Sequence, residues 1–96
     1  MTILVTFELS HTEEQTPQIK DFFCEILPDT RSFEGNLSAQ LFEKPQGGNA
    51  LVLQEEWRSP AHFDKYIEWR KAIGDFDRLG SLLTQAPQIS QLSKVL

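Results

Sequence analysis

The chain contains few residues that could form a disulfide or bind a metal ion. It holds one cysteine, Cys24, and two histidines, His11 and His62, which lie far apart along the sequence. One cysteine excludes an internal disulfide and a metal cage built from thiolates. No H-x-x-x-H or H-E-x-x-H spacing occurs, so the sequence offers no histidine pair typical of a metal-binding helix. We therefore expect no metal site.

Glycine-rich phosphate loops and clusters of basic residues are also absent. The only adjacent glycines, Gly47 and Gly48, fall in a predicted turn that no helix follows, and no dinucleotide fingerprint, P-loop or G-x-S-x-G elbow occurs. Lys and Arg number 9 against 14 Asp and Glu, which gives a net charge of −5. Phosphate binding needs clustered positive charge, so nucleic acid is not an expected partner. With nucleotide motifs missing as well, we expect no cofactor.

Long apolar runs do not occur. No stretch approaches the roughly 20 apolar residues that a membrane-spanning helix needs. The first residues lack the basic start and apolar run of a signal peptide. A length of 96 residues suits one small domain. We expect a single cytoplasmic domain over residues 1–96 with no membrane partner.

Alternating apolar residues predict four strands. Residues 2–9 have one apolar face, formed by Ile3, Val5, Phe7 and Leu9. Residues 36–43 alternate likewise, with one face formed by Leu37, Ala39 and Leu41. Residues 50–57 follow a turn that contains proline, two glycines and asparagine, so these two strands should form a hairpin. A last strand is expected after Pro87.

The first predicted helix shows an apolar stripe at helical spacing, formed by Ile19, Phe22, Phe23, Ile26 and Leu27. Pro28 interrupts the stripe, so we expect a kink and a short helical continuation that ends at Glu34–Gly35. Cys24 lies beside the stripe and is interpreted as a small, partly buried packing residue.

The second predicted helix begins after Ser59, a good capping residue, with Pro60 at its first position. Gly74 should break or bend this helix, and one or two further helical turns follow it.

The order β-α-β-β-α-β predicts a fold of the α+β class. It is the ferredoxin-like arrangement, in which helices cover one face of a four-stranded antiparallel sheet. The other face carries mixed residues and needs a partner, so we expect a homodimer formed through the sheet.

Residues 57–70 combine aromatic rings with polar groups and are the first candidates for a site. Helical spacing arranges most of them in two rows that share Tyr66. Such rows usually belong to a core, and chemistry alone favours packing over a pocket. The alternative is a pocket for a small, flat, hydroxylated aromatic molecule. Its candidate residues are Trp57, His62, Phe63, Tyr66, Trp69 and Arg70.

Two adjacent acids, Glu55 and Glu56, end the third predicted strand. Because side chains alternate along a strand, one of the two must face the covered side of the sheet. A buried carboxylate has a raised pKa unless a cation pairs with it. Possible partners are Arg31, Arg58 and Arg70. Glu55 is therefore either a solvated or ion-paired strand acid, which we favour somewhat, or a general base in contact with substrate.

The order of several segments resembles the antibiotic biosynthesis monooxygenase (ABM) domain family over nearly the whole chain. These segments are ILPDTRSFEGNLSAQLF, a glycine-containing hairpin, ALVLQEEWRSPAHFDKYIEWR, LGSLL and Pro87. The resemblance implies a ferredoxin-like fold whose sheets pair into a dimeric α+β barrel, with a pocket between sheet and helices. Family members include monooxygenases that oxidise quinols or anthrones with O2 and without flavin, haem or metal.

The resemblance also implies roles for individual residues. Trp57 matches the tryptophan of the family's EEW segment, and Tyr66 matches a helix position where family enzymes place a substrate-contacting aromatic. Helix geometry adds His62, Trp69 and Arg70, and Phe63 and Glu55 complete the set of substrate-binding candidates. We expect Tyr66 or His62 to handle the phenolic proton and Arg70 to stabilise the oxyanion.

Three other functions fit the same pocket. A non-catalytic dimeric domain could bind a small aromatic ligand or serve regulation, and an isomerase or decyclase could act on a polyketide-like ring without oxygen. A related branch degrades haem with an Asn in the first strand, a Trp on the second helix and an axial His. This chain has no Asn in residues 2–9 and shows Tyr66 and Phe76 at the other two positions, which disfavours haem degradation.

Overall fold

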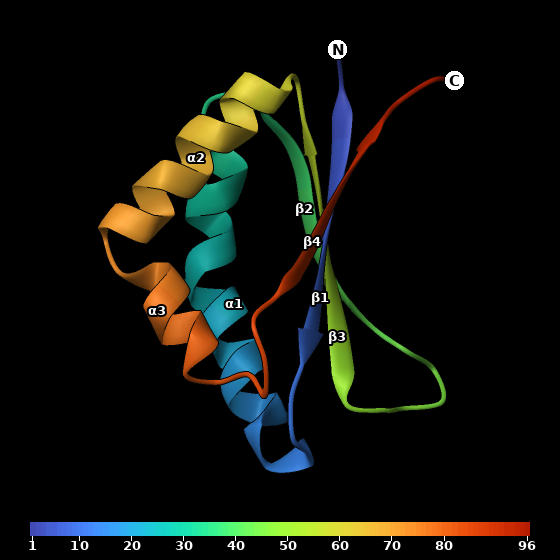
Figure 1. Cartoon of the computed structure of the whole chain (residues 1–96), viewed down its shortest axis with the longest axis vertical. Coiled ribbons are helices and arrows are strands. Elements are labelled where there is room, and N and C mark those ends of the chain that lie inside the picture. Colours follow the sequence, from blue (N-terminus) through green and yellow to red (C-terminus); the bar gives the residue numbers. More distant parts are fainter.

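The computed structural model describes residues 1–96 and has two layers, a four-stranded antiparallel sheet and a layer of helices on one of its faces (Figure 1). The predicted order β-α-β-β-α-β is confirmed, with a short third helix before the last strand. No helix is long and apolar enough to cross a membrane. The elements are β1 (Ile3–Ser10), η1 (Glu13–Gln15), α1 (Thr16–Ser32), β2 (Asn36–Glu43), β3 (Ala50–Trp57), α2 (Pro60–Ala72), α3 (Asp75–Gly80) and β4 (Gln88–Ser93).

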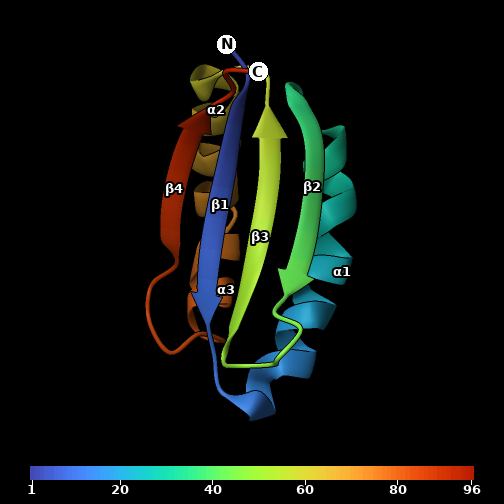
Figure 2. The same cartoon turned by 90° about the vertical axis from the view of Figure 1, so that its right-hand side faces the viewer.

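The strands lie in the order β2-β3-β1-β4 (Figure 2). In the pairing of β1 with β3, Val5 lies opposite Glu55 and Phe7 opposite Leu53. Cross-strand partners point to the same face, so the alternating apolar residues of both strands meet the helices together. The register therefore carries Glu55 and Trp57 to the covered face of the sheet.

The register of β2 contains an irregularity that the sequence pattern did not predict. It shifts between Asn36 and Ser38, which leaves Leu37 as an extra residue in the strand. Such a bulge interrupts the strict alternation of faces. Leu37 is accordingly 48% exposed, while Ala39 is 2% exposed. The expectation that Leu37 shares one face with Ala39 and Leu41 was wrong for this reason.

Helix α1 continues through Pro28 and ends at Ser32, earlier than the predicted end at Glu34–Gly35. Phe33 already has an extended backbone, with φ −70° and ψ 140°. Pro28 is exposed, and so is Cys24 one turn before it. The carbonyl that Pro28 leaves without a helix partner is that of Cys24, on the solvent side where water can bind it. Cys24 is therefore not the partly buried packing residue that we expected.

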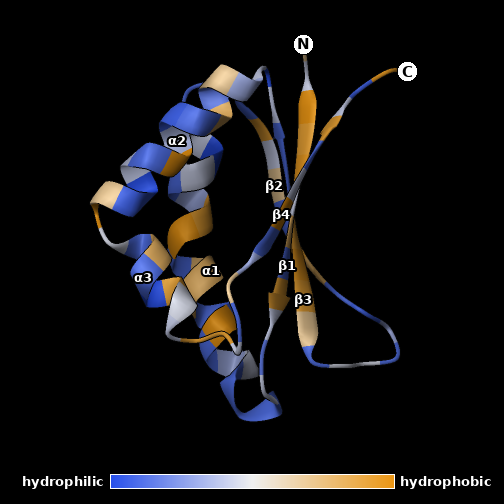
Figure 3. Cartoon of the chain, viewed as in Figure 1, coloured by the Kyte–Doolittle hydropathy of each residue, from blue (hydrophilic) through white to orange (hydrophobic).

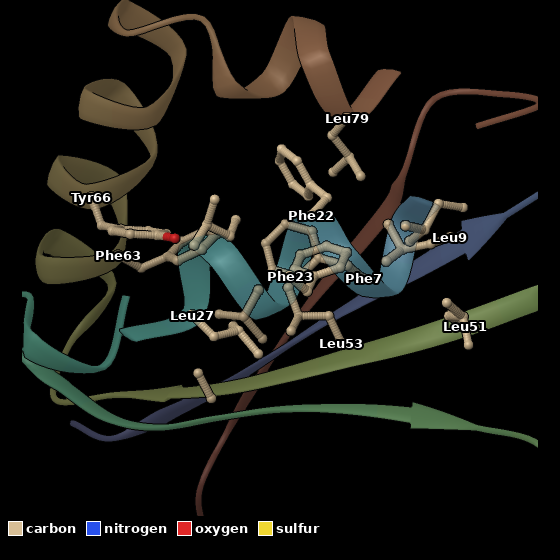
Figure 4. Packing of buried hydrophobic residues seen from close by; sticks show 14 of the residues in the cluster. Phe7, Leu9, Phe22, Phe23, Leu27, Leu51, Leu53, Phe63, Tyr66 and Leu79 are labelled. Atoms are coloured by element: carbon tan, nitrogen blue, oxygen red, sulfur yellow. The ribbon is translucent and has the colours of Figure 1, made fainter. Parts of the chain in front are cut away.

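The core lies between the sheet and the helices. In Figure 4, Leu53 of β3 lies below Phe22 and Phe23 of α1, and Phe7 of β1 lies below Phe22. Hydrophobic colour is strongest on stretches of β1 and β3 and in the middle of α1, while α2 and α3 are largely polar in colour (Figure 3). Packing on this one face also buries Glu55 of β3 in the same layer as Thr30 of α1, Arg70 of α2 and Asp75 of α3.

The junction of α2 and α3 lies at Gly74, as predicted. Its φ of 86° is in the left-handed region, which suits glycine because a side chain would be strained there. The turn redirects the chain so that Asp75 starts α3 close to the end of α2. This junction places Asp75 next to Arg70.

Candidate functional site

A cavity lies between the helices and the sheet. Residues from β1, α1, β3, α2 and α3 line it, and nine of the twelve are hydrophobic. The other three are Glu55, Arg70 and Asp75, which places two acids and one base among apolar walls. The hydrophobic lining residues are Phe7, Phe22, Phe23, Ile26, Leu53, Tyr66, Ile67, Phe76 and Leu79. A mostly apolar hollow with a few polar groups is the usual form of a small-molecule site.

Side chains fill most of this cavity. About 30 Å³ remains for the centre of a water-sized molecule, which is room for a water or two or for dioxygen. A planar aromatic molecule is larger than this. Ile67 and Phe76 are the half-buried residues of the lining, so they mark the side of the cavity that lies nearest to solvent.

Glu55 is the acid that the register of β3 carries into the covered layer. Its side chain is 1% exposed, and it forms no ion pair. Its Oε1 accepts a hydrogen bond of 3.1 Å from the indole Nε1 of Trp57. Burial raises the pKa of Glu55 from 4.5 to about 7, against the opposing effects of the Trp57 hydrogen bond and the positive charge of Arg70. A carboxyl with this pKa is present in both protonation states near neutral pH, as a general base or acid requires.

Arg70 is buried and holds three helices together. Its Nη1 donates to Asp75 Oδ2 over 2.7 Å, and its Nε donates to the Tyr66 hydroxyl over 2.9 Å. Its Nη2 donates to the carbonyl of Ile26 over 2.9 Å and to Thr30 Oγ1 over 3.0 Å. Four of the five N–H groups of the guanidinium are thus engaged. Arg70 brings positive charge to the cavity wall but has little hydrogen-bonding capacity left for a ligand.

The Tyr66 hydroxyl belongs to the same network. It lies 2.6 Å from Thr30 Oγ1, which itself donates to the carbonyl of Ile26 over 3.3 Å. With that donation in place, Tyr66 donates its proton to Thr30. Burial and, second, the negative charge of Glu55 raise the pKa of Tyr66, although Thr30 and Arg70 act in the opposite direction. Tyr66 therefore stays a neutral phenol near neutral pH and contributes its ring to the cavity.

His62 lies at the start of α2 and does not line the cavity. Its backbone N–H donates to the capping Oγ of Ser59, and its Nδ1 lies 2.7 Å from the same oxygen. Its ring packs directly on Gly35, where an added Cβ would come within 2.3 Å of the imidazole. The sequence placed His62 among the candidates for proton transfer, and the structure separates it from Glu55.

The remaining three aromatic candidates form a cluster beside the cavity rather than its wall. Trp57 is fully buried, and its ring centroid lies 4.8 Å from that of Tyr66 and 6.0 Å from that of Phe63. Trp69 stacks on Phe33 with ring centroids 5.4 Å apart. These contacts match the packing interpretation of the sequence pattern. Of the seven predicted site residues, the cavity brings together Glu55, Tyr66 and Arg70.

Two residues of the buried network around Arg70 were missed from the sequence, Asp75 and Thr30. A signal for Asp75 exists, because Arg70 shares the apolar side of α2 and a buried charge needs a partner. Asp75 is the first acid after Arg70, and it is 7% exposed. Thr30 gave no signal, since a threonine on the apolar side of a helix is common. No group of three or more His, Cys, Asp or Glu side chains is arranged to hold a metal ion.

Solved structures of several other proteins share this architecture. No curated protein sequence matches the chain. Rv0793 from Mycobacterium tuberculosis superposes with a TM-score of 0.88 at 21% identity, over 100% of this chain and 97% of that one. A conserved protein from Methanosarcina mazei Go1 gives 0.90 at 18% identity, over 99% and 94% of the two chains. SnoaB from Streptomyces nogalater, a cofactor-independent oxygenase in a mutant form, gives 0.84 at 10% identity, over 99% and 94%.

Structural similarity at such low sequence identity shows the fold alone, so the family is assigned from a family model. The model described as "Antibiotic biosynthesis monooxygenase" matches residues 2–70. The match covers well over half of the chain and includes Glu55, Tyr66 and Arg70, while α3 and β4 lie beyond it. The chain therefore belongs to the antibiotic biosynthesis monooxygenase family.

Proposed function

We propose that this protein is a cofactor-independent monooxygenase that oxidises a small aromatic quinol or an anthrone-type substrate with O2. The observation that carries the proposal is a buried carboxyl, Glu55, in a largely apolar cavity, with a pKa of about 7. Family membership supports it, as does the fold shared with SnoaB, which is described as a cofactor-independent oxygenase.

Glu55 supplies the one step for which such a reaction needs a protein group. Its carboxylate takes the acidic proton of the substrate and leaves an electron-rich anion. The anion passes an electron to O2, and the radical pair combines into a peroxide that recovers the proton from Glu55. Loss of water then gives the quinone, so that one oxygen atom enters the product and the other leaves as water. The four electrons taken from the substrate reduce O2 completely.

The cavity walls support this step. Deprotonation in an apolar site benefits from nearby fixed positive charge, which Arg70 provides with four of its five N–H groups already engaged. Tyr66 contributes a ring against which a flat substrate can pack. Glu55 thus takes the role of proton acceptor, for which the sequence offered Tyr66 or His62 and, as the less favoured interpretation of a strand acid, Glu55 itself.

A homodimer through the uncovered face of the sheet is part of the proposal. Phe42 of β2 and Leu92 of β4 are 45% and 55% exposed, and both point away from the helices. Leu92 pairs with Leu4 of β1 and Phe42 with Val52 of β3, so apolar side chains are spread across this face. Burying such a face against a second copy removes it from water. A cytoplasmic location stays a prediction from the sequence.

A second function is a non-catalytic dimeric domain that binds a small ligand or serves regulation, and one observation favours the regulatory role over turnover of an aromatic substrate. The cavity leaves only about 30 Å³ free, so the protein has to open before an aromatic molecule enters. An isomerase or decyclase would use the same cavity and the same base without O2.

Oxygen uptake separates these functions. Metal-free protein is supplied with a reduced naphthoquinol or an anthrone, and uptake is compared with the autoxidation blank. A monooxygenase consumes O2 in proportion to protein, while an isomerase turns over anaerobically and a binder does neither. No protein-dependent uptake with either substrate would overturn the proposal.

A further inference from the structure

Trp57 does not line the cavity, yet it is the hydrogen-bond partner of the cavity's central acid. The two residues stand two positions apart on β3 and so point to the same face of the sheet. Trp57 is 0% exposed and Glu55 1% exposed. The hydrogen bond between them is therefore shielded from water.

The position of the indole is fixed from three sides. Its ring lies against Phe63 at 6.0 Å and against Tyr66 at 4.8 Å, measured between ring centroids. Phe33 meets it edge-on at 6.2 Å and 71°. A ring held in this way cannot turn to follow Glu55, so the carboxyl has to adopt the orientation that the indole N–H sets.

The direction of the hydrogen bond decides which oxygen can act. An indole N–H is a donor only, so Glu55 Oε1 must accept. An oxygen that accepts this bond serves as the carbonyl oxygen when the acid is protonated, which leaves Oε2 to carry the proton. The other ionisable groups around the cavity are Arg70 and Tyr66 from α2 and Asp75 from α3, and none of them is hydrogen-bonded to Glu55.

We propose that Trp57 is a positioning residue for the base. It anchors Glu55 Oε1, fixes the orientation of the carboxyl and makes Oε2 the oxygen that exchanges the proton with substrate. The inference rests on the proposed function, in which Glu55 is the general base. It also gives the tryptophan of the EEW segment a role through Glu55 rather than through contact with substrate.

The hydrogen bond can be tested without any turnover. NMR follows the indole N–H resonances of Trp57 and Trp69 and the carboxyl carbon of Glu55 between pH 5 and 9. The Trp57 resonance should titrate together with Glu55, with a common midpoint near pH 7, while Trp69 serves as the internal control and stays unchanged. The Trp57 titration should vanish in Glu55→Gln. A Trp57 resonance that does not follow Glu55 would overturn the proposal.

Trp57→Phe tests the positioning role. Loss of a hydrogen bond to the ionised form should raise the midpoint of Glu55 by about one pH unit. In kinetics, kcat/KM should fall about tenfold and the midpoint of its acid limb should rise with that of Glu55. Trp69→Phe is the matched control, because it makes the same change at an indole that is not hydrogen-bonded to Glu55.

The outcomes of this comparison are distinct. A rise of the Glu55 midpoint in Trp57→Phe alone supports positioning through the hydrogen bond. The same rise in Trp69→Phe, or no rise in either variant, would overturn it. If the Trp57 and Glu55 resonances titrate together but no protein-dependent oxygen uptake occurs, the proposed function fails while the pairing stands.

Discussion

At the scale of single residues, Glu55 imposes a cost on folding that depends on pH. The folded state holds its proton up to a pH of about 7, while the unfolded chain releases it at the ordinary value of 4.5. Between these two values the folded state binds more protons, so the free energy of unfolding falls as the pH rises. The loss is about 3 kcal/mol, and it is complete above pH 7.

Glu55→Gln should remove this slope. Glutamine keeps an acceptor for the Trp57 indole but carries no charge, so the variant should be more stable than wild type at pH 8, by about 3 kcal/mol or less. The difference should narrow as the pH falls towards 5. Urea unfolding at equal protein concentration measures this difference in stability. The control is Glu68→Gln, which makes the same change at an exposed residue. A constant difference between the two proteins from pH 5 to 8 would contradict a buried, titrating Glu55.

Tyr66→Phe separates structure from chemistry at the same site. The change keeps the ring but removes the hydroxyl that joins Thr30 and Arg70, which leaves a buried N–H without its partner. We expect a loss of about 1–3 kcal/mol in stability. Turnover should fall far less than in Glu55→Gln, since Tyr66 does not take the substrate proton. A fall as large as that of Glu55→Gln would return the role of base to Tyr66.

At the scale of elements, α3 is held to α1 and α2 by charged contacts. Asp75 pairs with the buried Arg70 at 2.7 Å, while Arg78 of α3 reaches Glu25 of α1 at 2.6 Å on the surface. The first pair is shielded from water and the second is open to it, so the two contacts should differ widely in strength. The position of α3 matters because Phe76 and Leu79 close one side of the cavity.

Asp75→Ala should destabilise the protein by about 3–5 kcal/mol, because it leaves the positive charge of Arg70 buried without its counter-charge. Glu25→Gln breaks the exposed pair and should change stability little. Thermal or urea unfolding of both variants makes the comparison. Equal effects would mean that the buried pair does not anchor α3.

The helices and strands also show how much of the fold and of the site could be predicted from the sequence alone. Alternation and the helical stripe predicted the strands, the hairpin and both main helices, because those periods follow from burial on one side. The bulge at Leu37 was not predictable, since it depends on pairing with β3. In the site, Glu55 and Arg70 could be proposed because a covered strand face and a helix stripe each carried a charge. The link to Asp75 and Thr30 needs the three-dimensional placement of α1 and α3.

At the scale of the whole molecule, the two faces of the sheet differ in their exposure to solvent. The helices cover one face (Figure 1). On the other face, the side chains of Phe42 and Leu92 are exposed. A domain of this size buries only about two thirds of the surface of its unfolded chain, and a second copy on the sheet would bury more.

Leu92→Glu should therefore convert the dimer to a monomer, because it places a charge in an interface that has to be desolvated. Light scattering with size-exclusion chromatography measures the mass. Ile73→Glu, which alters an equally exposed residue at the end of α2, should leave the dimer intact. A monomeric wild type, or dissociation by Ile73→Glu but not by Leu92→Glu, would argue against the sheet as the interface.

The most direct test of Glu55 as the base is the pH dependence of oxygen uptake in wild type and Glu55→Gln, corrected for autoxidation, with a reduced naphthoquinol. Because the ionised form acts, kcat/KM for wild type should rise through a midpoint near pH 7 and level off above it. Glu55→Gln should be about 10²–10⁴-fold slower and lack this limb, while Glu68→Gln should match wild type. Uptake by Glu55→Gln at the wild-type rate, with the same pH profile, would contradict a base at Glu55.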